Sequence, residues 1–256
     1  LFTEQWRCRP RIDGEFKKIE ANQVADFLVK EFTVEEVWAA IKECDGNKAP
    51  GPNGLNMLFF QKSWKFLQVD IMKFMKEFYS NSKLGNGAYC SFVTLIPKKE
   101  NPNSLTDYRL ISLINSPYKV LSKVLANKIK QVLPTVIDKA LSTFVGGRNI
   151  KVRVLIANEV VDWWKKSKKK GLILKLDFQK AYDSVNWNCL FQMLSSFGFG
   201  SRWMRWMEEC VGSARISVLV NGSPSAEFCP QKGLRQGDPL SPFLFIIVAE
   251  GLIILL

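Results

Sequence analysis

Apolar residues recur at helical spacing along much of the chain. Thr33 to Glu36 has the spacing of a capping box, and apolar positions at helical intervals follow it, which predicts a short amphipathic helix that ends near Cys44. Ser116-Pro117 is a favourable helix start, and the apolar face after it predicts a helix that runs toward Pro134. Another helix is expected over Val154 to Lys166.

The second half of the chain mixes helical and strand patterns. Apolar positions from Leu190 to Phe197 predict a core-facing helix, and a second helix is expected around Trp203 to Met207. The apolar segment 216–220, the turn residues Asn221-Gly222 and a return through Phe228 predict a β-hairpin. Helices packed on a small sheet give an α+β fold class.

The last apolar run, residues 243–256, contains Glu250 and is shorter than the roughly 20 residues that a bilayer span needs. We therefore expect a buried helix there, in preference to a membrane span. The segment Leu1 to Pro10 has no secretory signal, and the chain does not begin with Met. Because no helix-ending signal follows the last apolar run, we expect the chain to be a fragment.

Composition excludes several kinds of chemistry. The chain has no histidine, which removes Ser-His-Asp and Cys-His catalysis and zinc sites with histidine ligands. The six cysteines are scattered without a C-x-x-C pair, which indicates a reduced, intracellular compartment. A formal net charge of +12 and a pI near 9.4 favour a polyanionic partner, although a solvated basic surface explains the charge equally well.

One carboxylate stands out in this sequence. The alternating apolar run Leu172 to Leu176 ends abruptly at Asp177, and the residues after it suit a turn into a helix. An acid at the open end of a buried strand is well placed to bind a metal ion. A plain helix cap is the alternative interpretation of the same residue.

Three further segments stand in a fixed order around this motif: Leu95 to Lys99, Asp107 to Leu113, and Gly233 to Pro242. Together with residues 172–183 they resemble the reverse transcriptases of plant non-LTR retrotransposons, of the long interspersed nuclear element type. The resemblance begins near Lys48 and runs to the last residue. It implies a right-hand polymerase fold with fingers and a partial palm, in which helices pack on a small, mostly antiparallel sheet.

The resemblance also implies a division of the chain. Residues 1–32 would be an upstream linker remnant, residues 33–170 an N-terminal extension with the fingers, and residues 171–256 a palm truncated before the second aspartate motif. Since the family's Asp-Asp block is absent from the sequence, we expect this chain alone not to polymerise.

The implied reaction is RNA-directed DNA synthesis, in which a primer 3′ hydroxyl attacks a deoxynucleoside triphosphate with the help of two Mg²⁺ ions. In the matching positions, Asp177 is the catalytic acid and a metal ligand, and the backbone carbonyl of Phe178 is a second metal ligand. Asp183 shares the motif, and we expect it to be a helix-start or structural acid.

The resemblance assigns a nucleotide-binding role to four more side chains and one glycine. Tyr182 matches the position whose ring excludes a 2′ hydroxyl, and Lys98 and Arg109 match fingers residues that hold the triphosphate. Gln236 and Gly237 match the block that packs near the incoming base and the template. Plain salt bridges are the alternative for the two cations.

The partners implied are an RNA template, a DNA primer and deoxynucleoside triphosphates, with no membrane and no indication of the oligomeric state. Nuclear or cytoplasmic location follows from the family alone. Two alternatives remain open: a non-catalytic nucleic-acid-binding remnant, for which the basic charge would suffice, and a maturase-like RNA-binding protein.

A basic cluster before the Asp177 strand is expected to contact nucleic acid; its members are Lys165, Lys166, Lys168, Lys169 and Lys170.

Overall fold

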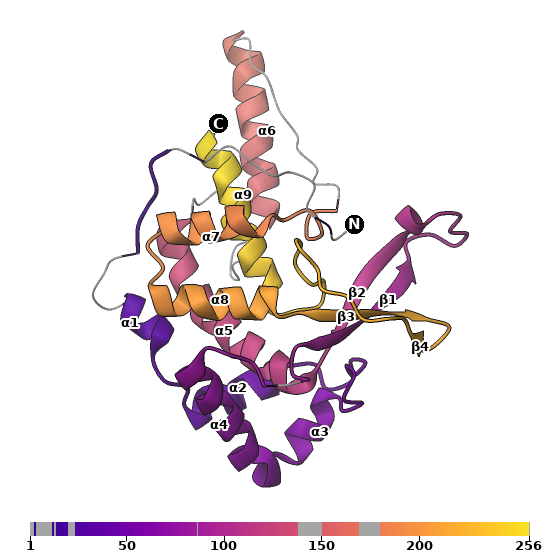
Figure 1. Cartoon of the computed structure of the whole chain (residues 1–256). Helices are drawn as coiled ribbons and strands as arrows, with labels where there is room; N and C mark the ends of the chain where they lie inside the picture. Colours follow the sequence, from indigo (N-terminus) through magenta and orange to yellow (C-terminus); the bar gives the residue numbers. More distant parts are fainter. Residues whose placement is uncertain are drawn as a thin grey trace.

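The structure is a computed structural model that describes residues 3, 12, 14–19, 24–85, 87–137, 150–168 and 180–255. Its N-terminal part is helical (Figure 1). The predicted capping box is confirmed, because the Thr33 side chain accepts from the Glu36 N–H while the Glu36 carboxylate accepts from the Thr33 N–H. The four helices of this part are α1 (Val24–Val29), α2 (Val34–Glu43), α3 (Met57–Lys62) and α4 (Trp64–Asn81).

A four-stranded sheet in the order β2-β1-β3-β4 joins distant parts of the chain. β1 pairs with β2 antiparallel and with β3 parallel, and β3 pairs with β4 antiparallel. Within the described residues the sheet is therefore mostly antiparallel, as predicted, and the α+β class is confirmed. The strands are β1 (Cys90–Pro97), β2 (Tyr108–Ile114), β3 (Arg215–Val220) and β4 (Ser223–Pro224), and a short 3₁₀ helix, η1 (Leu105–Asp107), precedes β2.

The predicted hairpin forms around Asn221 and Gly222, which both have positive φ, of 50° and 82°. Two positive φ values in succession are the signature of the turn that best matches the twist of paired strands. The return segment reaches Phe228, whose backbone exchanges hydrogen bonds with Ile216. This hairpin extends β3 away from the helices (Figure 1).

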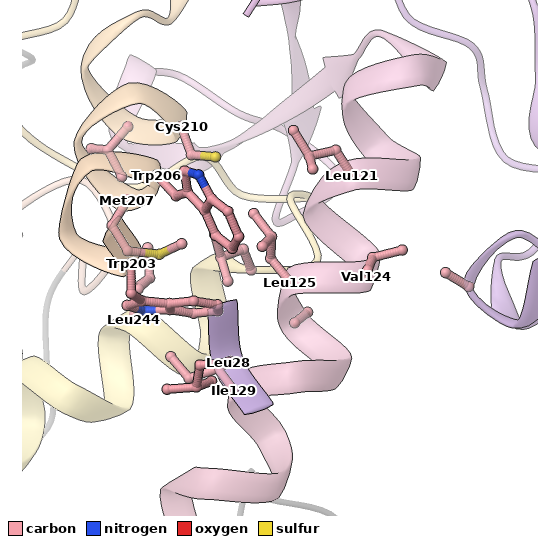
Figure 2. Close-up of a cluster of buried hydrophobic side chains, with 14 of the residues drawn as sticks. Leu28, Leu121, Val124, Leu125, Ile129, Trp203, Trp206, Met207, Cys210 and Leu244 are labelled. Atoms are coloured by element: carbon pink, nitrogen blue, oxygen red, sulfur yellow. The ribbon is translucent and has the colours of Figure 1, made fainter. Parts of the chain in front are cut away.

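The core lies where α5 (Ser116–Val136) meets the later helices and α1. Burying each large apolar side chain here contributes about 1.5–3 kcal/mol relative to exposure. As predicted, α5 runs toward Pro134, and it continues two residues past this proline. A proline in the last turn removes a single backbone hydrogen bond, and the neighbouring Leu133 and Val136 are fully buried. Figure 2 shows this cluster, which includes Leu28, Leu121, Leu125, Ile129, Trp203, Trp206 and Leu244.

The apolar C-terminal run forms the helix α9 (Ser241–Leu255), which packs against α7 (Trp187–Ser196) and α5. Its buried positions occur on all sides, as expected of a helix inside a core. Among the described helices, none combines the length and the apolar character that crossing a membrane requires. The remaining helices are α6 (Ile150–Ser167), α7 (Trp187–Ser196), α8 (Ser201–Gly212) and α9 (Ser241–Leu255).

Five of the cysteines lie in the described part of the chain, and all five are free thiols. The predicted domain boundaries at 32/33 and 170/171 stay predictions. Nevertheless, β1 of the predicted fingers pairs directly with β3 of the predicted palm, so these two segments share one sheet.

Candidate functional site

A cavity of about 470 Å³ lies beside the sheet, where the β1–β2 hairpin meets the turn at residues 180–183 and the Gln236 loop. Its described lining is largely apolar, and three of the polar side chains are cationic. A pocket of this size can hold a small organic ligand. The residues that line it are Leu95, Lys98, Leu105, Thr106, Tyr108, Arg109, Leu110, Lys180, Ala181, Asp183, Val218 and Gln236.

Lys98 is held in place by the tip of the β1–β2 hairpin. Its Nζ donates to the Thr106 carbonyl at 2.9 Å, and its backbone N–H donates to the Asp107 carbonyl at 2.7 Å. The tip is closed by Asp107, whose carboxylate accepts from the Asn103 N–H at 2.9 Å and pairs with Lys99 at 3.0 Å. These interactions lower the pKa of Asp107 to about 2, the Asn103 N–H contributing most.

Arg109 stands opposite Ile96 in the β1–β2 register and is exposed. It lines the same cavity as Lys98 and Lys180, whereas Asp183 is the one carboxylate among the described residues of the lining. The described part of the lining therefore carries three cations and one acid and is electropositive. Such a pocket attracts an anionic ligand.

Gln236 and Gly237 lie against the strand β2. The Ser112 N–H donates to the Gln236 carbonyl at 2.7 Å, and Gln236 also lines the cavity. Gly237 has φ +109°, and a Cβ at this position would lie 2.8 Å from the Ser112 carbonyl oxygen. Only glycine allows this backbone to approach β2 so closely.

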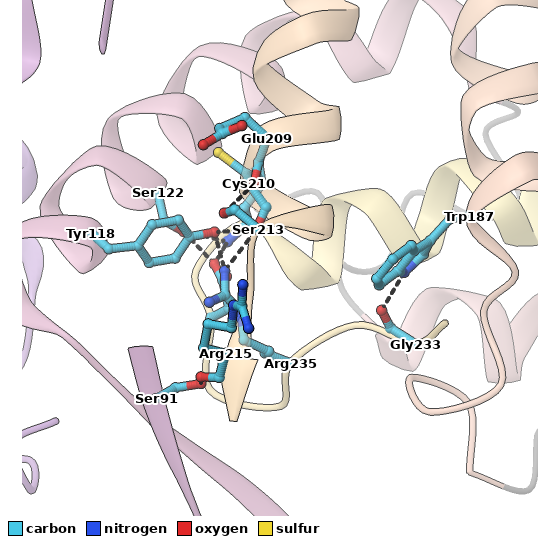
Figure 3. A network of polar contacts seen from close by, with 12 residues as sticks. Ser91, Tyr118, Ser122, Trp187, Glu209, Cys210, Ser213, Arg215, Gly233 and Arg235 are labelled. Atoms are coloured by element: carbon cyan, nitrogen blue, oxygen red, sulfur yellow. Dashed lines mark hydrogen bonds and ion pairs between the residues drawn. The ribbon is translucent and has the colours of Figure 1, made fainter. Parts of the chain in front are cut away.

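Tyr182 belongs to a turn that is joined to the Gly233 segment. The Leu234 N–H donates to the Tyr182 carbonyl at 2.8 Å, and the Gly233 N–H donates to the Val185 carbonyl at 2.7 Å. The Trp187 indole N–H donates to the Gly233 carbonyl at 2.8 Å (Figure 3). Three hydrogen bonds therefore connect two motifs that lie about fifty residues apart in the sequence.

The ring of Tyr182 is half-buried and stacks on Phe245, with ring centroids 5.4 Å apart and planes 25° from parallel. It is not among the residues that line the 470 Å³ cavity. The structure thus brings Lys98, Arg109 and Gln236 together around one cavity. Tyr182 and Gly237 are not among the residues that line it.

Asp183 is buried, and burial raises the pKa of its carboxyl group, partly offset by Lys180, a hydrogen bond with Gln236, and Lys98. This agrees with the structural role that its motif predicts. Lys180 was not singled out in the sequence, because an isolated lysine carries no chemical signal of its own. Its place between Asp177 and Tyr182 was the available clue.

The predicted metal ligands Asp177 and Phe178 lie outside the described residues. In the described part of the chain, no group of three or more His, Cys, Asp or Glu side chains could hold a metal ion. The described residues alone therefore do not form a metal centre. Of the predicted basic cluster, Lys165 and Lys166 lie in the last turn of α6 and Lys168 follows the helix, and all three side chains are exposed. Lys169 and Lys170 lie outside the described residues.

Comparison with solved structures gives a distant likeness. Two structures of a Cas6-RT-Cas1–Cas2 complex, one of them partial, align over 90% of this chain at 15% identity, with TM-scores of 0.47. The alignment covers 34% of the chain in the partial complex and 21% in the other.

Sequence comparison gives closer relatives. The chain is 30% identical over 224 residues to an uncharacterised 149 kDa protein of transposon TX1 from Xenopus laevis, covering 88% of this chain and 17% of that protein. It is 26% identical over 236 residues to a retrovirus-related Pol polyprotein of the type-2 retrotransposable element R2DM from Drosophila melanogaster, covering 89% and 22%. A 37-residue stretch is 56% identical to an uncharacterised mitochondrial protein of Arabidopsis thaliana, covering 14% of this chain and 30% of that protein.

The chain spans less than a quarter of the TX1 and R2DM proteins. The family model for reverse transcriptase (RNA-dependent DNA polymerase) matches residues 96–256, which is more than half of the chain. This range contains every residue that lines the 470 Å³ cavity except Leu95. The chain therefore belongs to the reverse transcriptase family, as a domain of the non-LTR retrotransposon type.

Proposed function

We propose that the 470 Å³ cavity binds the incoming deoxynucleoside triphosphate of an RNA-directed DNA polymerase. The observation that carries this proposal is the convergence of Lys98, Arg109 and Gln236, from three separate motifs, around one cavity. The partners would be an RNA template and a DNA primer. The 37-residue match to Arabidopsis thaliana supports a plant source for the element.

The chemistry of the lining suits this ligand. A triphosphate carries several negative charges, which the cations Lys98, Arg109 and Lys180 would offset. Arginine can bind two phosphate oxygens at once, and lysine supplies a compact point charge. The apolar side chains Leu95 and Leu110 would contact the base and the sugar, which are less strongly hydrated than the triphosphate.

Magnesium would be held by the Asp177 carboxylate and the Phe178 backbone carbonyl, both hard oxygen donors of the kind this ion prefers. Bound there, the ions would stabilise the attacking and leaving oxygens. Asp183 is a poor substitute, because burial raises the pKa of its carboxyl group and so favours the uncharged form. The described side chains therefore serve to bind and orient the triphosphate.

Tyr182 would select deoxyribose by excluding a 2′ hydroxyl at the edge of the cavity, since its neighbours Ala181 and Asp183 line the cavity although its own ring does not. The support for this role is positional: its backbone is tied to Leu234, and its ring is fixed against Phe245. In a form of the protein that extends primers, Tyr182→Ala should admit ribonucleotides. Asp177→Asn should abolish extension while leaving template binding largely unchanged, and retained extension would refute the metal assignment.

The direct test measures binding of a deoxynucleoside triphosphate to the chain by equilibrium dialysis. Lys98→Gln and Arg109→Gln should each weaken binding about 10-fold, which corresponds to about 1.4 kcal/mol. Lys83→Gln is the matched control, because Lys83 is an exposed cation that pairs with Glu209 outside the cavity lining. Equal affinity in all three variants, or no binding by the unmodified chain, would refute the proposal.

A further inference from the structure

A buried ion pair lies directly beneath the Gln236 loop. Arg235 Nη2 donates to the Asp238 carboxylate at 3.0 Å, and the two side chains are 8% and 5% exposed. The same nitrogen donates to the Cys210 carbonyl at 2.9 Å, and the guanidinium lies over the Tyr118 ring, 4.2 Å from its centroid. Figure 3 shows Arg235 between Tyr118 and Cys210.

Asp238 accepts hydrogen bonds from α5 and from its own loop. The Tyr118 hydroxyl donates to it at 2.9 Å, the Ser122 hydroxyl donates to the other carboxylate oxygen, and the Leu240 N–H donates at 3.0 Å. With Arg235, the carboxylate therefore has four donors. A buried charge that is satisfied in this way has one strongly preferred position.

The ion pair flanks Gln236 and Gly237, the two loop residues that belong to the candidate site. Gln236 and Gly237 lie between Arg235 and Asp238 in sequence, so anchoring both flanking side chains fixes the backbone between them. On its other side the loop contacts β2, where the Gln236 carbonyl accepts a hydrogen bond from the Ser112 N–H. Neither Arg235 nor Asp238 is among the residues that line the 470 Å³ cavity.

We propose that Arg235 and Asp238 are positioning residues, which hold Gln236 at the cavity by fixing its backbone from α5 and α8. This inference rests on the proposed nucleotide-binding function. A pair of well-packed apolar residues would stabilise the core as well as an ion pair does, or better. The benefit of the ion pair is a single loop conformation, in which Gln236 faces the cavity and Gly237 approaches β2.

The first test uses Asp238→Asn, which keeps the shape of the side chain and removes its charge. In this variant the amide protons of Ser112 and Leu234 should exchange with solvent at least about 10-fold faster, measured by hydrogen–deuterium exchange at a temperature where circular dichroism shows a folded chain. The Ser112 amide donates to Gln236 in the loop, and the Leu234 amide belongs to the residue before Arg235 and donates to Tyr182, so both report on how firmly the loop is held.

Lys128→Met is the matched control. Lys128 is 2% exposed and pairs at 3.6 Å with Glu36, which is 32% exposed, so this variant also removes a buried charge, but one far from the loop in sequence and outside the cavity lining. It should lower the melting temperature without changing exchange at Ser112 and Leu234.

Tyr118→Phe is a gentler second variant, since it keeps the ring under Arg235 and removes one donor to Asp238. It should shift exchange in the same direction by a smaller factor.

The second readout is binding of a deoxynucleoside triphosphate to the same folded variants. Asp238→Asn should bind about 5- to 10-fold more weakly than the unmodified chain, and Lys128→Met should bind equally well. Exchange that matches the Lys128→Met control would overturn the inference, and so would faster exchange with unchanged affinity. Absence of nucleotide binding by the unmodified chain would instead count against the proposed function, while the exchange result still decides whether the pair positions the loop.

Discussion

The Ser112 N–H donates to the Gln236 carbonyl at 2.7 Å and so joins two motifs that are far apart in the sequence. Ser112 belongs to β2, which also carries Arg109, and Gln236 belongs to the loop that follows the hairpin of β3 and β4. This bond sets the distance between the cation at the hairpin and the amide of the loop. A ligand in the cavity would contact both side chains at once.

Gly237→Ala should separate this loop from β2. The backbone has φ +109°, which side chains rarely adopt, and the new Cβ would lie 2.8 Å from the Ser112 carbonyl oxygen. A positive φ alone costs about 1–2 kcal/mol for alanine, and we expect at least about 1 kcal/mol more from the contact. Urea unfolding of the variant measures the loss.

Gly222→Ala is the control for that experiment, because Gly222 has φ +82° but a Cβ added to it would have no other atom within 4 Å. Its loss in free energy of unfolding should reflect the positive φ alone, without the steric contact that Gly237→Ala adds. Equal destabilisation of the two variants would show that the close approach of Gly237 to β2 has no energetic consequence.

Asp107 should titrate at an unusually low pH. Its carboxylate accepts backbone N–H bonds and pairs with Lys99, so its pKa falls to about 2, below the unfolded value of about 3.9. The stability that it contributes is therefore fully present above about pH 4 and is lost as the pH falls toward 2. Carbon-13 NMR of the carboxyl group measures the midpoint, and a value near 4 would contradict the closed hairpin tip.

Asp107→Asn tests what the hairpin tip does for Lys98. Losing the charge should loosen the segment 98–107 and weaken triphosphate binding about 2- to 5-fold, because Lys98 would be less well positioned. Glu43→Gln is a suitable control, since Glu43 pairs with Lys123 outside the cavity lining. Unchanged affinity in Asp107→Asn would show that the tip is not needed.

Asp183→Asn should change the pH dependence of stability. Burial raises the folded-state pKa of Asp183, so the stabilisation by its protonated form is present below the unfolded pKa of about 3.9 and is lost as the pH rises through the folded value. Asparagine does not ionise, so its contribution to stability does not fall as the pH rises. The variant should be at least as stable as the unmodified chain at pH 7, with the difference vanishing near pH 4, as thermal unfolding at the two pH values would reveal.

The basic cluster at the end of α6 should contribute to nucleic-acid affinity through phosphate contacts. If Lys165, Lys166 and Lys168 each contact one phosphate, replacing all three by Gln should reduce the salt slope of single-stranded RNA binding by about 2. The comparison variant removes the same charge from α4, at Lys65, Lys73 and Lys76. Equal slopes for the two triple variants would show that the cluster has no special part in binding.

Local patterns in the sequence determined the elements that depend on near neighbours. The capping box of Thr33 and Glu36 and the turn at Asn221-Gly222 each involve groups within four residues, so their hydrogen bonds follow from the sequence directly. The ordered motifs around Lys98, Arg109 and Gln236 likewise indicated the family. The C-terminal apolar run could be assigned to a buried helix from its length and its one acid.

Only the tertiary structure decided which of these groups meet. The parallel pairing of β1 with β3, the place of Lys180 in the cavity and the hydrogen bonds from Tyr118 and Ser122 to Asp238 all join segments from distant parts of the chain. No spacing in the sequence encodes such contacts, because they depend on how several helices pack at once. Sequence therefore determined what each segment can form, and packing decided which side chains share a site.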